Sequence, residues 1–221
     1  MGNVLLVHGA WVDSSCWDSV TPALRERGHR VETVELHRGT VAADTKVAQE
    51  AIDSLGTEVV ACGWSYGGMV ITGLDLPAGS HLVYLCAYMP DEGESATLLN
   101  LRHPGDVMTV VQGDDAGDTF LAGDEIDELA WADAPSDLAA AARASLRPQP
   151  MQTFLDPPIR ASWRDVASTY VICRQDRVIN PDLQREMAQR ATSVVEWDTS
   201  HSPMLSRPDL IVELLDGLAA R

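Results

Sequence analysis

The sequence predicts an α/β protein built on a mostly parallel sheet of about six strands, with helices on both faces. Short apolar runs rich in Val, Ile, Leu and Tyr alternate along the chain with longer segments of helical pattern. Repeated strand–helix units of this kind form parallel sheets with right-handed crossovers. Several of the apolar runs also lack polar alternation, which is typical of strands that are buried on both faces.

The apolar runs locate the strands, and the segments between them locate the helices. The expected strands are residues 4–7, 31–35, 59–63, 82–87, 168–174 and 193–198. The expected helices are residues 16–27, 41–55, 66–74, 181–190 and 208–220. Pro181 and Pro208 begin the last two helices, where the fixed φ of proline suits the first turn. A length of 221 residues fits one domain, residues 1–221.

One long segment interrupts this alternation. From residue 88 to about residue 167 we expect no strand, because the segment is rich in Pro, Gly, Ala and acidic residues. We expect it to be inserted outside the sheet, over its carboxyl edge. Residues 91–137 hold thirteen acidic residues and one arginine, which fits a solvated helical face and also a mobile lid over a site. Residues 114–118 resemble a calcium loop but lack its sixth-position glycine.

The charge and composition exclude several classes of partner. Lys and Arg number 16 against 33 Asp and Glu, a formal charge of −17, which argues against binding of nucleic acid or an anionic membrane. No apolar run reaches membrane-spanning length and no signal-peptide pattern opens the chain, so we expect a cytoplasmic protein. Lys46 is the only lysine, which leaves almost no candidate for Schiff-base chemistry. Association as a homodimer stays open.

The four cysteines, Cys16, Cys62, Cys86 and Cys173, show no C-x-x-C spacing, and the last three lie within apolar runs. We expect small buried hydrophobic residues. A nucleophilic role would require a neighbouring base and electropositive surroundings. No metal and no cofactor is expected.

A G-x-S-x-G motif stands between an expected strand and an expected helix, as Gly63-Trp64-Ser65-Tyr66-Gly67-Gly68. A strand that turns sharply into a helix forces its central residue into a strained conformation, and glycines on both sides avoid collisions at the turn. Ser65 is therefore expected at the carboxyl edge of the sheet, at a helix N-terminus that favours developing negative charge. This context predicts that Ser65 is a nucleophile.

A serine nucleophile needs a base, and the base needs a group that orients it. His201 lies in the loop after the last expected strand, and Asp176 follows the expected strand at 168–174. Both belong to the edge where open α/β sheets bind ligands. The chain order is Ser65, Asp176, His201, as the motif requires. Asp182 is an alternative acid, although we expect it inside a helix.

A second motif, Val7-His8-Gly9-Ala10-Trp11, follows the first expected strand. Acyl transfer builds negative charge on a carbonyl oxygen, which two backbone N–H groups stabilise. We expect one N–H from Tyr66 and the other from Ala10, with Trp11 as the alternative. His8 is expected to brace this loop through hydrogen bonds, and Gly9 to allow close approach of the backbone.

Bulky residues near the expected site are candidates for a substrate pocket. Trp11, Trp131 and Phe154 are expected to contact the substrate, although packing of the insertion onto the sheet also accounts for residues of this kind. A small or medium apolar acyl group fits these side chains. An anionic substrate fits the acidic insertion poorly.

Taken together, His8-Gly9, the run from Gly63 to Gly68, Asp176 and His201 resemble the α/β-hydrolase superfamily. His8-Gly9-Ala10-Trp11, Trp17 and the short insertion are similar to the branch of plant hydroxynitrile lyases, plant methylesterases and related bacterial esterases. The resemblance implies a Ser–His–Asp triad and a lid at residues 88–167. It also implies about six strands, because the chain begins at what would be the family's third strand.

Differences between this sequence and the residue pattern of the branch exclude some of the activities found in it. Hydroxynitrile lyases of this branch have Thr after the first-loop histidine and Lys after the catalytic histidine, where this chain has Gly9 and Ser202. Haloalkane dehalogenases use an aspartate in place of Ser65. The expected function is hydrolysis of a small-molecule carboxylic ester, thioester or lactone through an acyl-enzyme on Ser65. A non-catalytic small-molecule receptor is an alternative, and so is a lyase or cyclase with His201 as base.

Overall fold

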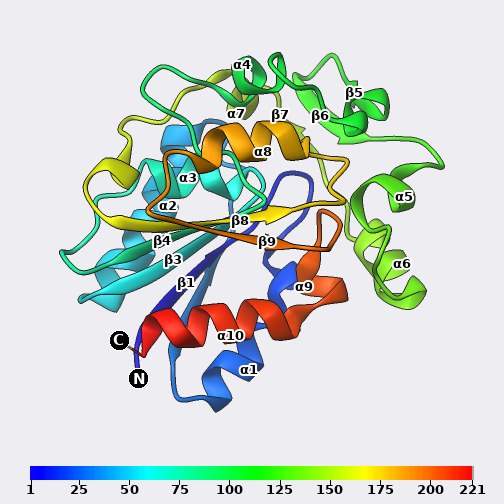
Figure 1. Ribbon diagram of the computed structural model, residues 1–221. Helices are drawn as coiled ribbons and strands as arrows, with labels where there is room; N and C mark the ends of the chain where they lie inside the picture. The colour runs from blue at the N-terminus through cyan, green and yellow to red at the C-terminus, as the bar shows by residue number, and fades with distance from the viewer. Residues whose placement is uncertain (221) are drawn as a thin grey trace.

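The computed structural model describes residues 1–220 and contains a six-stranded sheet between layers of helices (Figure 1). All neighbouring strands of this sheet run parallel. In spatial order the strands are β2 (Arg30–Val34), β1 (Asn3–Val7), β3 (Val59–Trp64), β4 (His81–Leu85), β8 (Ala167–Cys173) and β9 (Ser193–Trp197). The predicted fold class and the predicted number of strands are confirmed.

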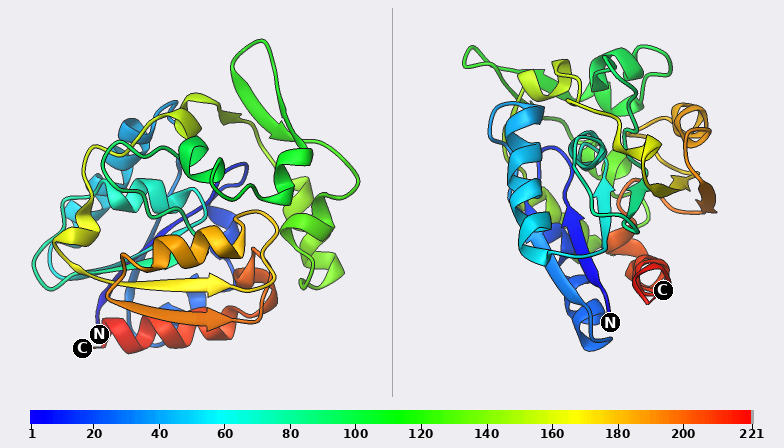
Figure 2. Two further views of the ribbon diagram at one scale, coloured as in Figure 1. Left: turned by 45° about the horizontal axis from the view of Figure 1, so that its top comes forward. Right: turned by 90° about the vertical axis from the view of Figure 1, so that its left-hand side faces the viewer.

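Helices cover both faces of the sheet (Figures 1 and 2). Along β1, Leu5 and Val7 join the core beneath α2 (Val41–Leu55), α3 (Gly67–Thr72) and α8 (Pro181–Ala188). Val4 and Leu6 join the core beneath α1 (Thr21–Glu26) and α10 (Pro208–Ala219), as alternation along a strand requires. No helix among residues 1–220 has the length and apolar character to cross a bilayer. The remaining helical elements around this sheet are η1 (Ser14–Trp17) and α9 (Pro203–Ser206).

Two elements differ from the expectation for local reasons. The helix expected at residues 16–27 is divided into η1 and α1, because Pro22 occupies the first turn of a new helix. The strand expected to reach residue 87 ends at Leu85. Cys86 has a φ of 36°, which lies outside the β region and turns the chain away from the sheet.

Residues 86–166 connect β4 to β8 and form a group of short elements that we call the insertion (Figure 1). The expectation that this segment carries no strand is wrong, because it contains three short strands that form a small antiparallel sheet. The elements are α4 (Ala96–Asn100), η2 (Asp106–Thr109), β5 (Val111–Gly113), β6 (Asp118–Leu121), α5 (Ile126–Ala130), α6 (Ser136–Ala144), β7 (Gln149–Pro150), α7 (Gln152–Leu155) and η3 (Ser162–Arg164).

An acidic hairpin turn between β5 and β6 explains why the sequence pattern did not indicate these strands. The Asp114 side chain accepts hydrogen bonds from the backbone N–H groups of Ala116 and Asp118 at 2.9 and 3.0 Å, and Gly117 has a φ of 88°. Asp and Gly favour tight turns of this kind. The flanking strands are three and four residues long, which is too short for a visible alternation of polar and apolar residues.

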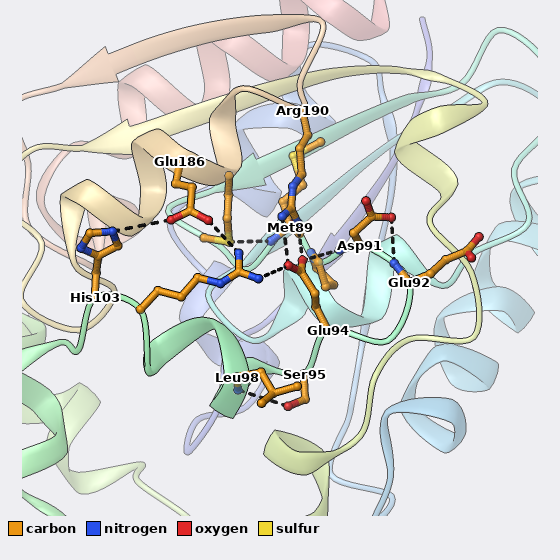
Figure 3. A network of polar contacts seen from close by, with 12 residues as sticks. Met89, Asp91, Glu92, Glu94, Ser95, Leu98, His103, Glu186 and Arg190 are labelled. Carbon is orange, nitrogen blue, oxygen red and sulfur yellow. Dashed lines mark hydrogen bonds and ion pairs between the residues drawn. The ribbon is translucent and has the colours of Figure 1, made fainter.

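A charged network fastens the start of the insertion to α8 (Figure 3). Arg190 Nη1 donates to Glu94 Oε2 at 2.6 Å and to the Met89 carbonyl oxygen at 2.6 Å. Arg102 donates to Glu94 Oε1 and, at 2.7 Å, to Glu186 on α8. Burial of Glu94 by itself would raise its pKa, but hydrogen bonds from Arg190, from a backbone N–H and from Arg102 lower that pKa to about 2.

Glu94→Gln is expected to destabilise the fold by about 1.5–3 kcal/mol at neutral pH, because it removes a largely buried carboxylate that accepts charge-assisted hydrogen bonds. The pKa of Glu94 is lowered by folding, so its stabilisation is present above the unfolded value and is lost as the pH falls from about 4.5 to about 2. Urea unfolding at neutral pH and at about pH 3 measures the effect. The difference between wild type and variant should shrink in acid, with Glu92→Gln as the exposed control. A difference that is equal at both pH values would contradict this account.

Candidate active site

Ser65 lies at the tip of the turn between β3 and α3. Its φ is 56°, a left-handed conformation that residues other than glycine adopt rarely and under strain. The turn depends on its glycines, because a Cβ on Gly63 would lie 2.6 Å from the Gly67 carbonyl oxygen. A Cβ on Gly67 would lie 2.5 Å from the carbonyl oxygen of Val7. The chain therefore contains the strained strand–turn–helix that the G-x-S-x-G pattern predicts.

His201 and Asp176 form a buried pair close to this turn. His201 Nδ1 lies 2.7 Å from Asp176 Oδ2, and the two residues are 3% and 4% exposed. Asp176 Oδ1 accepts hydrogen bonds from the backbone N–H groups of Val178 and Ile179 at 2.7 and 2.9 Å. An ionised carboxylate only accepts hydrogen bonds, so Nδ1 carries the proton and Nε2 of the neutral ring is free to accept one.

Two side chains donate hydrogen bonds to the backbone carbonyl oxygen of His201. Trp64 Nε1 donates to the His201 carbonyl oxygen at 2.7 Å, and Cys86 Sγ donates to the same oxygen at 3.2 Å. The rings of Trp64 and His201 also lie close together, with their centroids 5.2 Å apart. Sequence reasoning did not predict either role. A buried Trp normally finds an acceptor for its N–H. The position of Trp64 next to Ser65 was therefore the one feature of the sequence that could have indicated a hydrogen bond within the site.

Two other side chains hold the His201–Asp176 pair from neighbouring elements. Gln184 Nε2 on α8 donates to Asp176 Oδ2 at 2.8 Å. Asp133 of the insertion accepts a hydrogen bond from the Ser200 backbone N–H at 2.9 Å and another from the Ser200 hydroxyl. Because Ser200 directly precedes His201, the insertion anchors the histidine loop. These residues carry no local motif, and the sequence reasoning missed both.

The alternative acid lies elsewhere. Asp182 sits at the start of α8, where its Oδ1 accepts a hydrogen bond from Arg185 at 2.9 Å, and its side chain is largely exposed. His201 instead pairs with Asp176. The structure thus brings Asp176 to the histidine and leaves Asp182 in the helix where the sequence placed it.

The loop after β1 passes directly beside Ser65. A Cβ on Gly9 would lie 3.0 Å from the Ser65 Cβ, so glycine permits this contact. Ala10 and Tyr66 line the same cavity as Ser65. Within residues 1–220, neither of their backbone N–H groups donates a hydrogen bond to another protein group. Both N–H groups are therefore available as donors.

His8 braces this loop, as the sequence predicts. Its Nδ1 donates to the Gly9 carbonyl oxygen at 2.8 Å, and its Nε2 accepts from the Leu36 backbone N–H at 3.1 Å. Burial lowers the pKa of His8. A neutral ring satisfies both bonds, which assigns His8 a structural role.

A buried carboxylate supports Tyr66. The Tyr66 hydroxyl donates to Asp44 Oδ2 at 2.8 Å, and the Arg38 backbone N–H donates to Asp44 Oδ1 at 2.7 Å. Asp44 on α2 is fully buried, and its burial raises its pKa. This contact fixes the side chain of Tyr66, the residue directly after Ser65, whose backbone N–H is available as a donor. The sequence pattern of α2 gave no reason to assign Asp44 such a role.

A cavity of about 190 Å³ lies in front of Ser65, between the sheet edge and the insertion. Trp11 and Phe154 form part of its wall and stack with ring centroids 5.2 Å apart. A second cavity of about 20 Å³ adjoins it and is lined by Ser65, His201 and Trp131. All three residues predicted to contact substrate therefore face a cavity that Ser65 also lines. Among the described residues, no Asp, Glu, Lys, Arg or His lines the larger cavity.

Cys86, Asp176 and His201 are the one group of described residues that could offer three metal ligands, with ligand atoms within 4.8 Å of one another. Asp176 and His201 already bond to each other through these atoms. Burial raises the pKa of the Cys86 thiol well above its usual value, whereas metals bind the thiolate. The residues thus fit a hydrogen-bonded pair better than a metal centre. All four cysteines are free; Cys62, Cys86 and Cys173 are buried as predicted, whereas Cys16 is partly exposed.

A strained serine at the edge of a parallel sheet, close to a buried His–Asp pair, is the arrangement of an α/β hydrolase. The chain belongs to the alpha/beta hydrolase family, whose model matches residues 4–214. Alpha/beta hydrolase nvfD of Aspergillus novofumigatus is 31% identical to it over 198 residues, which cover 81% of this chain and 78% of that protein.

Other relatives place the chain within the family. Methylesterase 2 of Arabidopsis thaliana is 25% identical over 252 residues, which cover 97% of this chain and 95% of that protein. The crystal structure of a pyrethroid hydrolase from Sphingobium faniae shares the fold, with a TM-score of 0.84 at 21% identity and coverage of 99% and 97%. The resemblance to the branch with plant methylesterases is confirmed. The chain is a carboxylesterase-like hydrolase.

Proposed function

We propose that this chain hydrolyses neutral carboxylic esters of small molecules through an acyl-enzyme on Ser65. The observation that carries this proposal is the position of Ser65 between two cavities, a large apolar one and a small one that His201 lines. Methylesterase 2 of Arabidopsis thaliana, a relative that resembles this chain over almost its whole length, supports the same class of reaction.

The first half of the reaction forms the acyl-enzyme. His201 Nε2 takes the proton of the Ser65 hydroxyl while Ser65 Oγ attacks the ester carbonyl carbon. The carbonyl oxygen becomes negatively charged, and the N–H groups of Ala10 and Tyr66 stabilise it. Asp176 holds the imidazolium and stays ionised. The C–O bond of the ester then breaks, and His201 gives its proton to the leaving alkoxide.

The second half returns the enzyme to its starting state. A water molecule takes the place of the departed alcohol beside His201, which removes a proton from it as the water oxygen attacks the acyl carbonyl. The same two N–H groups stabilise the second oxyanion. His201 then returns the proton to Ser65 Oγ as the acyl bond breaks and the carboxylic acid leaves.

The two cavities support an assignment of the acyl part and the alcohol part of the substrate. The leaving alkoxide must lie near His201, which lines the smaller cavity of about 20 Å³. A space of this size holds about one water-sized group, so the alcohol part of the ester is small, as in a methyl ester. The acyl part occupies the larger cavity of about 190 Å³. This cavity offers no charged side chain among the described residues, so the acyl part is neutral.

A panel of esters tests the proposal. One series keeps a hexanoyl group and varies the alcohol from methyl to butyl and benzyl, and a second keeps methanol and varies the acyl group, with a thioester and a lactone added. We expect kcat/KM to be highest for the methyl ester and about tenfold lower for the butyl ester. A monomethyl dicarboxylate should be turned over at least about tenfold more slowly than its neutral counterpart. Equal rates for all alcohols, or a preference for the anionic acyl group, would contradict the assignment.

Asp133→Ala should lower kcat by roughly 10- to 100-fold with little change in KM, because the Ser200 N–H and hydroxyl lose their acceptor and the His201 loop is less well positioned. Steady-state kinetics with a methyl ester measures this split. Asp124→Ala, which removes another exposed carboxylate of the insertion, is the matched control. Partial rescue by Asp133→Asn, which keeps one acceptor, would support positioning. An unchanged kcat in Asp133→Ala would contradict it.

A further inference from the structure

A third cavity, of about 210 Å³, lies next to the small cavity that His201 lines. Neither Ser65 nor His201 is among the described residues that line this third cavity. The small cavity and the third cavity share four lining residues, which therefore form the wall between them: Val12, Trp64, Trp131 and Ser202. The third cavity thus lies outside the site described so far, behind a single layer of side chains.

One face of α6 and the segment around η1 form most of the rest of the third cavity. From α6 and the residue that follows it come Leu138, Ala141, Ala142 and Ser145. Their spacing of three and four residues places these side chains on one side of the helix. Near η1 the cavity is lined by Asp18 and Ser19, which are exposed. The third cavity therefore reaches the protein surface at this end.

Trp131 is the part of the shared wall that the insertion supplies. The residue is 4% exposed, and its backbone is held in both directions along the chain. Its N–H donates to the Asp127 carbonyl oxygen at 3.0 Å, and its carbonyl oxygen accepts from the Ala134 N–H at 2.9 Å. Trp64, the other aromatic residue of the wall, donates to the His201 carbonyl oxygen at 2.7 Å. Trp131 is therefore the large side chain of the wall whose size can vary without removing a hydrogen bond to His201.

From this arrangement we infer that Trp131 limits the size of the alcohol part of the substrate, and that the third cavity is a closed-off subsite for a larger alcohol. The inference rests on the proposed function, which places the alcohol part beside His201 in the cavity of about 20 Å³. Close-packed interiors accommodate an extra methylene only at a cost in free energy, so the Trp131 ring stops larger alcohol groups at the wall. With a smaller side chain in place of Trp131, the two cavities become continuous, and a butyl or benzyl group extends into space that is already present.

Two hexanoate esters test the inference through the ratio of kcat/KM for benzyl hexanoate to kcat/KM for methyl hexanoate. A ratio between two substrates cancels any general loss of activity. In Trp131→Ala we expect the ratio to rise at least about tenfold over the wild type, and in Trp131→Leu to rise by a smaller factor. Leu121→Ala is the matched control, because Leu121 lines the small cavity but not the third one. It should change the ratio by less than about threefold.

A second substitution tests whether the benzyl group enters the third cavity. Ala142 lines the third cavity from α6 and does not line the small one, so Ala142→Phe fills the third cavity alone. In the wild-type background Ala142→Phe should leave the ratio unchanged, because the Trp131 ring already closes the wall. In the Trp131→Ala background it should return the ratio close to the wild-type value, as expected for two side chains that share one cavity. Benzyl alcohol should likewise inhibit Trp131→Ala more strongly than the wild type or the double variant.

The outcomes separate this inference from the proposed function. Trp131→Ala should lower the Tm, because it leaves a space among buried residues; Trp131→Leu keeps an apolar side chain and carries the test if the alanine variant does not fold. An unchanged ratio in a folded Trp131 variant would overturn the inference and leave the esterase in place. A raised ratio that Ala142→Phe does not reverse would also overturn it, because the gain would not come through the third cavity. Absence of Ser65-dependent turnover of any ester would overturn the proposed function itself.

Discussion

Ser65→Ala is expected to lower kcat for a methyl ester by roughly four to six orders of magnitude. The variant lacks the oxygen that forms the acyl-enzyme, so neither half of the proposed reaction can proceed through it. The free N–H groups of Ala10 and Tyr66 and the cavity remain, and they account for a small residual rate above the uncatalysed reaction. Alanine keeps the Cβ at this strained turn, so the fold and its Tm should change little.

Single-turnover and steady-state kinetics with a methyl ester measure this loss. Ser19→Ala is the matched control, because Ser19 is an exposed serine outside the candidate site. Near-normal turnover in Ser65→Ala would exclude a nucleophilic Ser65. The alternative in which His201 acts as base in a lyase or cyclase would then account better for the site.

Asp176→Asn is expected to lower kcat by about four orders of magnitude. Asp176 Oδ1 accepts two backbone N–H groups at 2.7 and 2.9 Å, so an asparagine would keep its oxygen there and turn its NH₂ toward His201. A donor facing Nδ1 forces the imidazole proton onto Nε2. The ring could then no longer accept the proton of Ser65, although every residue would stay close to its place.

Kinetics across the pH range, together with thermal unfolding, separates this effect from a loss of structure. Asp182→Asn removes the alternative acid, which is exposed on α8 and pairs with Arg185, and it should retain wild-type turnover. The reverse result, with Asp182→Asn inactive and Asp176→Asn active, would exchange the two roles. Chain order alone does not decide between these carboxylates; the contact of Asp176 with His201 does.

The sequence predicted the parts of the site that depend on local pattern. Ser65, Asp176 and His201 each follow a short apolar strand, and the carboxyl ends of parallel strands share one edge of a sheet. The central strands β1, β3, β4 and β8 could be predicted because each is an almost wholly buried run of mainly apolar residues, whereas the edge strands β2 and β9 are partly exposed and could be predicted from their Val-rich composition. The role of the glycines around Ser65 could be predicted because a strand–turn–helix of this kind leaves no room for a Cβ at these positions.

The rest depends on contacts between distant parts of the chain. Asp133 reaches Ser200 across 67 residues, and nothing in either local sequence indicates the pairing. Asp44 resembles any acidic residue in the first turn of a helix until the fold buries it against Tyr66. The strands β5, β6 and β7 are at most four residues long, so their pairing, and not their periodicity, defines them.

Intact mass spectrometry after treatment with a fluorophosphonate probe tests the central claim most directly, because the probe phosphonylates only an activated serine. We expect a single adduct on the wild type and on Ser19→Ala, slower labelling in the presence of a methyl ester, and no adduct on Ser65→Ala. An unlabelled wild type, or an adduct that persists in Ser65→Ala, would contradict it.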